Sequence, residues 1–232
     1  MNYFPKTIYQ TWYTKQLPYG IQSTVNDMME MNPNYKHRLF DDDDMIEFID
    51  ACYSKRVLDC FNKLAIGAAK ADLWRYLILF RYGGVYLDMD SVIISNLDTL
   101  IGEDSCSIIS RERNYGLFTQ WCLMFMPESP ILRECIKKCF YNIDSNQMMD
   151  ITELTGPVLY SKVIEEFYDD PLIYSKSDDS INVDKEITHL KCYGFDYDGY
   201  AGFCNPYRDE LYKTKKSWRD QQNNNFSNNY AG

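Results

Sequence analysis

The chain has 232 residues, and its 24 basic and 34 acidic side chains give a formal net charge of −10. A protein of that sign repels nucleic-acid phosphates, and no basic cluster offsets the charge, so no nucleic-acid partner is expected. The length and the 45% of hydrophobic residues suit one globular domain. No apolar run of about 18 residues is present, so no transmembrane segment is predicted. The N-terminus lacks the pattern of a secretory signal, which predicts a cytoplasmic location.

The cysteines and histidines offer little for metal chemistry. The eight cysteines show no CxxC pair and no regular spacing. In a cytoplasmic protein we expect reduced and mostly buried thiols. His37 and His189 are the two histidines, and two are too few for a His-rich zinc site.

Strand and helix patterns alternate in the first part of the chain, which is typical of an α/β sheet with crossover connections. They predict, in order, a strand at 7–12, a helix at 23–31, a strand at 35–40 and a helix at 45–52. The acidic run 41–44 suits the N-terminal end of that last helix. Its alternative interpretation, a calcium loop, lacks the alternating ligands and central glycine of an EF-hand.

The longest predicted helix covers residues 62–82 and ends at Gly83-Gly84, since glycine just after the last turn is a common helix stop. The patterns beyond it predict strands at 85–87, 91–94, 105–110 and 116–125, and helices at 131–141 and 158–168. The polar, Asn-rich end has nothing to bury and is expected to be frayed or disordered. The predicted organisation is a single domain at 1–218 and a tail at 219–232.

Two pairs of side chains suggest chemistry. Asp88 and Asp90 follow an apolar strand two residues apart, and in an extended strand such residues project from the same face. Two carboxylates that close favour a hard divalent cation, Mn²⁺ or Mg²⁺, shared with phosphate oxygens. Asp72 and Arg75 share a helix face. Arg75 could neutralise a diphosphate while Asp72 accepts hydrogen bonds from sugar hydroxyls; the alternative is a weak surface ion pair.

The stretch from Ala71 to Tyr76, continued by Tyr82 to Asp90, resembles the signature of the DXD-containing glycosyltransferases. That family includes yeast Golgi α-mannosyltransferases and clostridial glucosylating toxins. Residues 5–12 resemble its first-strand motif, and the likeness runs over roughly residues 3–160. It implies a GT-A fold, meaning a Rossmann-like mixed sheet that binds a nucleotide sugar, is flanked by helices and carries the metal at a strand end.

The resemblance also implies roles for five residues toward the donor. Trp12 would stack on the base with Thr11 beside it, although plain core packing is the alternative for Trp12 and Tyr86. Asp72 would hold the hydroxyls of the donor sugar, and Arg75 would lie near the sugar and the diphosphate. Tyr86 would contact the phosphate.

For the metal, the resemblance places Asp88 near ribose, sugar and cation and makes Asp90 a direct ligand. The family often carries a late His before a Ser-Trp pair. Ser217-Trp218 is present here, but no His precedes it within 211–216. The candidates to replace that His are Tyr212, Lys213 and Lys215; the alternative is that water takes its place on the metal.

The resulting hypothesis is a metal-dependent glycosyltransferase that uses a UDP- or GDP-sugar and a glycan or other hydroxyl acceptor, with retention of configuration. Two alternatives stay open. The stretch 87–92 also fits a haloacid-dehalogenase-type phosphatase, in which Asp88 is phosphorylated and Asp90 acts as acid and base. The chain could also be a non-catalytic module that binds a nucleotide sugar.

Overall fold

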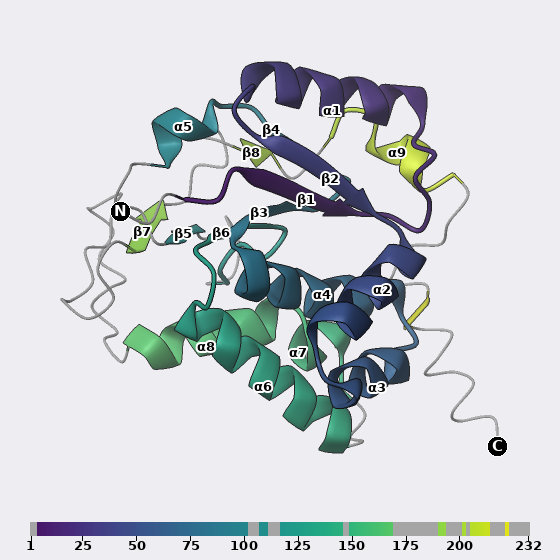
Figure 1. Cartoon of the computed structure of the whole chain (residues 1–232), viewed down its shortest axis with the longest axis vertical. Helices are drawn as coiled ribbons and strands as arrows, with labels where there is room; N and C mark the ends of the chain where they lie inside the picture. Colours follow the sequence, from purple (N-terminus) through teal and green to yellow (C-terminus); the bar gives the residue numbers. More distant parts are fainter. Residues whose placement is uncertain are drawn as a thin grey trace.

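The computed structural model describes residues 4–101, 107–110, 117–145, 149–168, 190–193, 201–202, 205–213 and 221–222. A six-stranded mixed sheet lies between two layers of helices (Figure 1). The strand order is β2-β1-β3-β6-β5-β7. This arrangement confirms the predicted α/β class with a mixed sheet flanked by helices.

The strands of the main sheet are β1 (Thr7–Thr11), β2 (Lys36–Phe40), β3 (Gly84–Leu87), β5 (Ser107–Ser110), β6 (Cys122–Phe125) and β7 (Leu190–Tyr193). β1 pairs in parallel with β2 and β3, and β6 runs antiparallel to both β3 and β5. Tyr9 stands opposite Tyr86, so the carboxyl ends of β1 and β3 lie at the same edge. A separate antiparallel pair joins β4 (Val92–Ile93) to β8 (Ala201–Gly202).

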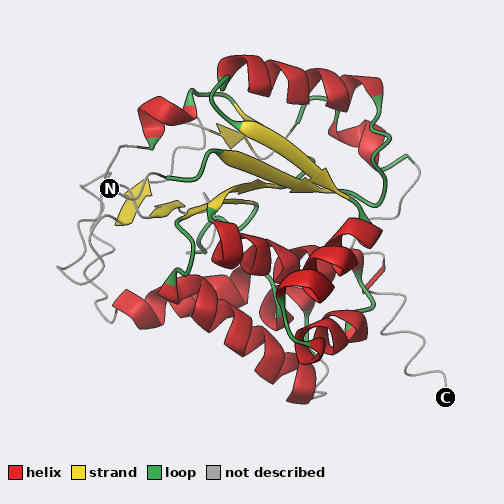
Figure 2. Cartoon of the chain, in the orientation of Figure 1, coloured by secondary structure: helices red, strands yellow, loops and turns green. Residues whose placement is uncertain are grey.

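The helices divide between the two faces of the sheet (Figure 2). One layer holds α1 (Tyr19–Met31), α5 (Leu97–Leu100) and α9 (Arg208–Leu211). The other holds α2 (Asp42–Cys52), α3 (Lys55–Lys63), α4 (Gly67–Tyr82), α6 (Pro130–Ser145), α7 (Ile151–Leu154) and α8 (Pro157–Tyr168). α4 is buried on nearly every side because the sheet covers one face and neighbouring helices cover the other.

The structure corrects the predicted bounds of two helices. α1 begins at Tyr19, four residues before the predicted start at 23, because Pro18 lies directly outside its first turn. The predicted helix at 62–82 is in fact the end of α3 followed by α4. Leu64 and Ile66 have extended backbones between the two helices, and both side chains are buried there. The break turns the chain so that both helices pack against the core.

Two predicted helix ends are confirmed. Asp41 and Asp44 form a capping box at the start of α2, which accounts for the acidic run as a helix N-terminus. At the end of α4, Gly83 and Gly84 have positive φ angles of 63° and 106°. A Cβ on Gly84 would lie 2.7 Å from the Thr7 carbonyl oxygen, so only glycine permits the immediate passage from α4 to β3.

The second half contains more structure than was predicted. α7, α9 and the strands β7 and β8 were missed, and β6 begins at Cys122, later than the strand predicted at 116–125. Residues 105 and 106 of the strand predicted at 105–110 lie outside the described residues. The domain boundary at 218 stays a prediction. Within the predicted tail, however, Gln222 is buried and bonds to both Asp150 and the backbone N–H of Ile151, so the expectation that this stretch has nothing to bury was wrong at Gln222.

The described cysteines are free thiols, and four are buried, as expected: Cys60, Cys122, Cys135 and Cys139, with Cys52 partly exposed. His37 makes a 2.9 Å hydrogen bond to Gln10, and His189 lies outside the described residues. In the described part of the chain, no helix has both the length and the apolar character needed to cross a bilayer.

Candidate functional site

The predicted site residues gather at the carboxyl ends of β1 and β3. Thr11 ends β1, and Asp88 directly follows β3, where its backbone N–H donates to the Trp121 carbonyl at 2.8 Å. Asp88 to Ser91 form a turn closed by a 3.0 Å hydrogen bond from the Ser91 N–H to the Asp88 carbonyl. The two carboxylates are therefore held by a turn and not by the extended strand that the spacing predicted. They still lie close enough for Asp88 to raise the pKa of Asp90.

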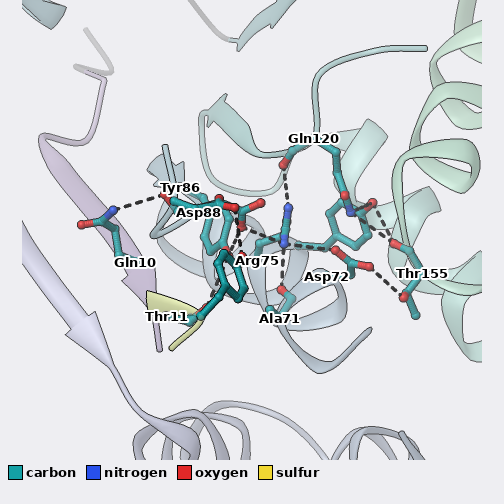
Figure 3. A network of polar contacts seen from close by, with 12 residues as sticks. Gln10, Thr11, Ala71, Asp72, Arg75, Tyr86, Asp88, Gln120 and Thr155 are labelled. Carbon is teal, nitrogen blue, oxygen red and sulfur yellow. Dashed lines mark hydrogen bonds and ion pairs between the residues drawn. The ribbon is translucent and has the colours of Figure 1, made fainter. Parts of the chain in front are cut away.

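Arg75 lies at the centre of this site (Figure 3). Its Nη2 is 3.1 Å from Asp72 Oδ1 and 3.0 Å from Asp88 Oδ1, and its Nη1 donates to the Gln120 carbonyl at 2.8 Å. The side chain is only 4% exposed. The alternative of a surface ion pair between Asp72 and Arg75 is therefore wrong. Two carboxylates raise the pKa of Arg75 despite its burial, which keeps the guanidinium charged.

Tyr86 completes the support of Asp88. Its hydroxyl donates to Asp88 Oδ1 at 2.8 Å and lies 3.3 Å from Thr11 Oγ1. The Arg75 guanidinium lies 4.4 Å from the centre of the Tyr86 ring, a cation–π arrangement. Tyr86 is buried, so the packing alternative describes its ring, while its predicted contact with the phosphate stays a prediction. Together Arg75 and Tyr86 fix the orientation of the Asp88 carboxylate.

Asp72 is buried next to α7 and the start of α8. Its Oδ2 accepts a 3.1 Å hydrogen bond from the Thr155 hydroxyl. Burial outweighs the attraction of Arg75 and raises the pKa of Asp72 to about 6. A Cβ on Gly156 would lie 3.2 Å from Asp72 Oδ2 and 2.8 Å from the Thr152 Cα, so the Gly156-Pro157 turn packs tightly against this carboxylate.

Asp90 is bound by residues of the segment 205–212, more than 100 residues later in the sequence. Its Oδ2 accepts a 3.0 Å hydrogen bond from the Tyr212 hydroxyl and lies 3.2 Å from Arg208 Nε. Its carbonyl accepts from the Asn205 N–H at 2.8 Å. Burial, followed by repulsion from Asp88, raises the pKa of Asp90 to about 6. Tyr212 is thus the one of the three candidates for the missing late His that contacts Asp90; Lys213 is exposed, and Lys215 lies outside the described residues.

Trp12 lies beside Tyr212, the residue that bonds to Asp90. Its ring meets that of Tyr212 edge to face at 6.0 Å and packs against a small buried cluster of Ile21, Met89 and Leu211. The side chain stays partly exposed. Packing therefore accounts for one part of Trp12 and leaves another part accessible, so its predicted stacking on a base stays a prediction.

Three contributors to the site escaped the sequence analysis. Thr155 and Gln120 belong to no motif that distinguishes them from other polar residues, and Gln120 acts on Arg75 through its carbonyl oxygen. Arg208 lies 118 residues after Asp90 in the sequence. Only its proximity to the predicted late contact around 211–216 could have drawn attention to it.

The donor set suits a hard cation that other oxygens help to bind. Among the described residues, no cluster of three or more His, Cys, Asp or Glu side chains could hold a metal. Asp88 and Asp90 supply two carboxylates, whose side chains are 26% and 11% exposed. Their mutual repulsion marks a place where positive charge is stabilising. Mg²⁺ and Mn²⁺ commonly combine one or two carboxylates with phosphate oxygens and water, so the residues present fit such an ion.

A protein-family model matches part of the chain. Residues 18–107 match the family model described as a glycosyltransferase sugar-binding region containing a DXD motif. The matched segment includes Asp72, Arg75, Asp88 and Asp90. It confirms the resemblance inferred from the motif.

Individual relatives agree with that match. The chain is 28% identical over 205 residues to an initiation-specific α-1,6-mannosyltransferase of Candida albicans. That alignment covers 71% of this chain and 53% of the mannosyltransferase. The chain is 35% identical over 97 residues to inositol phosphoceramide mannosyltransferase 3 of Schizosaccharomyces pombe, covering 42% and 27% respectively. The chain thus spans about half or less of the length of these relatives.

Among solved structures, the UDP-bound glycosyltransferase domain of the YGT toxin superposes with a TM-score of 0.59 at 9% identity. The alignment covers 90% of this chain and 82% of that one. At that identity the likeness concerns the fold alone, and it confirms the predicted GT-A architecture.

Proposed function

We propose that this chain, whose residues 18–107 carry the sugar-binding region of the DXD-containing glycosyltransferases, transfers a hexose from a nucleoside-diphosphate sugar to a hydroxyl acceptor. The observation that carries the proposal is the Asp72–Arg75–Asp88 network. A buried, permanently charged guanidinium there orients a carboxylate at the carboxyl ends of two parallel strands, the edge at which α/β sheets bind their ligands.

For the donor we propose a UDP- or GDP-hexose. The mannosyltransferase names of the relatives favour mannose as the sugar, while the solved neighbour was determined with UDP. A glycan or glycoconjugate hydroxyl is the proposed acceptor. The negative charge of the chain argues against nucleic acid in that role.

The residues divide the work of binding. Trp12, partly exposed at the end of β1, would stack on the base, with Thr11 beside it. Arg75 supplies a fixed positive charge under the diphosphate, and Asp72 holds Arg75 and faces the sugar side. Tyr86 acts through Asp88, because its hydroxyl already donates to that carboxylate.

Asp88 and Asp90 would hold the proposed Mn²⁺ or Mg²⁺. When bound, such an ion neutralises the charge that develops on the departing nucleoside diphosphate. Arg75 and Tyr86 orient Asp88, and Tyr212 orients Asp90, so both carboxylates are positioned before any ligand arrives. We further propose retention of configuration by front-face attack; an inverted anomer in the NMR spectrum of the product would contradict this mechanism.

A thermal-shift panel tests the proposal, with UDP, GDP, CMP and dTDP each added with and without Mn²⁺. A ligand at 100 times its dissociation constant stabilises the folded state by ~2.7 kcal/mol, which for a domain of this size is a rise of roughly 5–10 °C. We expect that rise with UDP or GDP only when Mn²⁺ is present, and its loss in Asp90→Asn. Arg56→Gln, which removes an exposed arginine bound to Asp144 on α6, is the control and should behave as the original chain.

The outcomes also separate the alternatives. Binding without sugar transfer to any acceptor or donor hydrolysis would favour the non-catalytic module. If no nucleotide raises the melting temperature and a phosphatase activity disappears in Asp88→Asn, the phosphatase interpretation would replace the proposal.

A further inference from the structure

We propose that Arg208 is a donor-binding residue that neutralises Asp90 while no cation is bound, and that it moves to the donor diphosphate once a cation occupies that carboxylate. The inference rests on the proposed function. It assigns a role to a residue that lies outside the segment matched by the family model.

The first argument is the oxygen atom that Arg208 occupies. Arg208 Nε lies 3.2 Å from Asp90 Oδ2, the same oxygen that accepts the Tyr212 hydrogen bond. A divalent cation on this carboxylate would stand next to the guanidinium, and two positive charges at that distance repel strongly in a partly buried site. Occupation of Asp90 by a cation would therefore displace Arg208 from Asp90.

The second argument is that the backbone of this segment is held in place, whereas the Arg208 side chain, whose guanidinium lies 5.5 Å from the centre of the Tyr212 ring, reaches solvent. The backbone of this segment is fixed, because the Asn205 N–H donates to the Asp90 carbonyl and its Nδ2 donates to Thr24 Oγ1 at 2.8 Å. Tyr207 packs so closely on Gly20 that a Cβ there would lie 2.3 Å from its ring. The Arg208 side chain itself is 37% exposed, whereas that of Arg75 is 4% exposed. Arg208 can change partner while its Cα stays beside the site.

The third argument is charge balance. Three carboxylates, Asp72, Asp88 and Asp90, face two guanidinium groups in the site, which leaves one negative charge. Adding a divalent cation leaves one positive charge, which attracts an incoming diphosphate. Without Arg208 the same loaded site would be neutral before the donor arrives. A guanidinium also binds phosphate oxygens in a planar, bidentate manner, so a displaced Arg208 has a suitable partner in the donor.

The test measures two affinities in the full-length chain, and the proposal predicts that they change in opposite directions. Mn²⁺ binding without nucleotide is followed by electron paramagnetic resonance of the free ion. Binding of UDP and of GDP at saturating Mn²⁺ is followed by calorimetry. In Arg208→Gln we expect Mn²⁺ to bind several-fold more tightly because its competitor is gone. The nucleoside diphosphate that binds should do so about tenfold more weakly, as expected for loss of a charged phosphate contact.

Two further variants make the result specific. Arg208→Lys keeps the positive charge but loses the planar guanidinium that binds two phosphate oxygens at once. Its nucleotide affinity should therefore lie between those of the original chain and Arg208→Gln. Arg56→Gln removes the same charge from an exposed ion pair with Asp144 and should leave both affinities unchanged.

A fall of both affinities in Arg208→Gln would show that the residue only supports the local structure, and unchanged affinities would make it a surface ion pair; either result overturns the proposal. Failure of the proposed function is distinguishable, because then the original chain itself binds neither UDP nor GDP in the presence of Mn²⁺.

Discussion

The two sides of the site differ in how they are built. The inner side, Asp72, Arg75 and Asp88, is largely buried, and Arg75 and Asp88 are 13 residues apart in sequence. The outer side joins Asp90 to Arg208 and Tyr212, and 122 residues separate Asp90 from Tyr212. The inner guanidinium is enclosed by fixed partners, while the outer one reaches solvent. We infer that the inner side holds the site in shape, while the outer side can rearrange when ligands bind.

Removing each arginine in turn should produce the largest contrast between the two sides. Arg75→Met leaves Asp72 buried without its cationic partner, and breaking a buried pair in this way costs about 3–5 kcal/mol of unfolding free energy. Arg208→Met breaks a pair of which one member is 37% exposed, so its cost should stay below about 1 kcal/mol.

Urea unfolding of the two variants and the original chain measures this difference directly. Equal losses of stability in Arg75→Met and Arg208→Met would contradict the division into a rigid and a mobile side. Arg56→Gln again serves as the control for removal of an exposed arginine.

A smaller effect is expected from pH, through Asp72. Its pKa of about 6 in the folded chain exceeds its ordinary value, so the folded state holds the proton more tightly than the unfolded state does. The contribution of Asp72 to stability is therefore complete below pH ~4 and is lost as the pH rises through ~6, by on the order of 3 kcal/mol.

The measurement is the difference in unfolding free energy between the original chain and Asp72→Asn, followed from pH 4 to 7 without metal. Carboxylates with lowered pKa values, such as Asp44 and Asp144, make the folded state more stable as the pH rises. Because they are present in both proteins, their effect cancels in the difference between the two. A flat difference would show that Arg75 offsets the burial of Asp72 fully.

The smallest effect concerns the end of the chain. Gln222 Nε2 donates to Asp150 Oδ2 at 2.6 Å, and its Oε1 accepts from the Ile151 N–H at 3.0 Å. These bonds hold the start of α7, which leads to Thr155 and thereby to Asp72. Gln222→Ala should cost about 1 kcal/mol, and Gln22→Ala, on the exposed face of α1, should cost less. If a chain ending at Trp218 unfolds at the same urea concentration as the full chain, Gln222 contributes nothing.

The sequence was most informative where neighbouring elements build the site. The motif predicted Asp72, Arg75, Asp88 and Asp90 together because Gly83-Gly84 connects the helix to the strand without a loop, which brings the helix face beside the strand end. The layered α/β fold followed from the same alternation of elements.

Contacts between distant segments could not be predicted in this way. Tyr212 became a candidate only through the family's late His, and nothing in the composition of 205–213 indicates that Arg208 meets Asp90. Thr155 is an ordinary polar residue until α7 packs beside α4. The break at Leu64 and Ile66 was missed for a similar reason. Their apolar character continues a helical pattern, but burial in the core decides their backbone.

The direct link at Gly83-Gly84 also bears on the order in which the site forms. Closing the 13-residue span between Arg75 and Asp88 costs less chain entropy than closing the 122-residue span between Asp90 and Tyr212, by roughly 2 kcal/mol. A growing chain can therefore pair Arg75 with Asp88 once β6 has been synthesised. Asp90 must wait until Arg208 and Tyr212 have been synthesised. The ability to exchange ligands would then be acquired last, after the scaffold that supports it is in place.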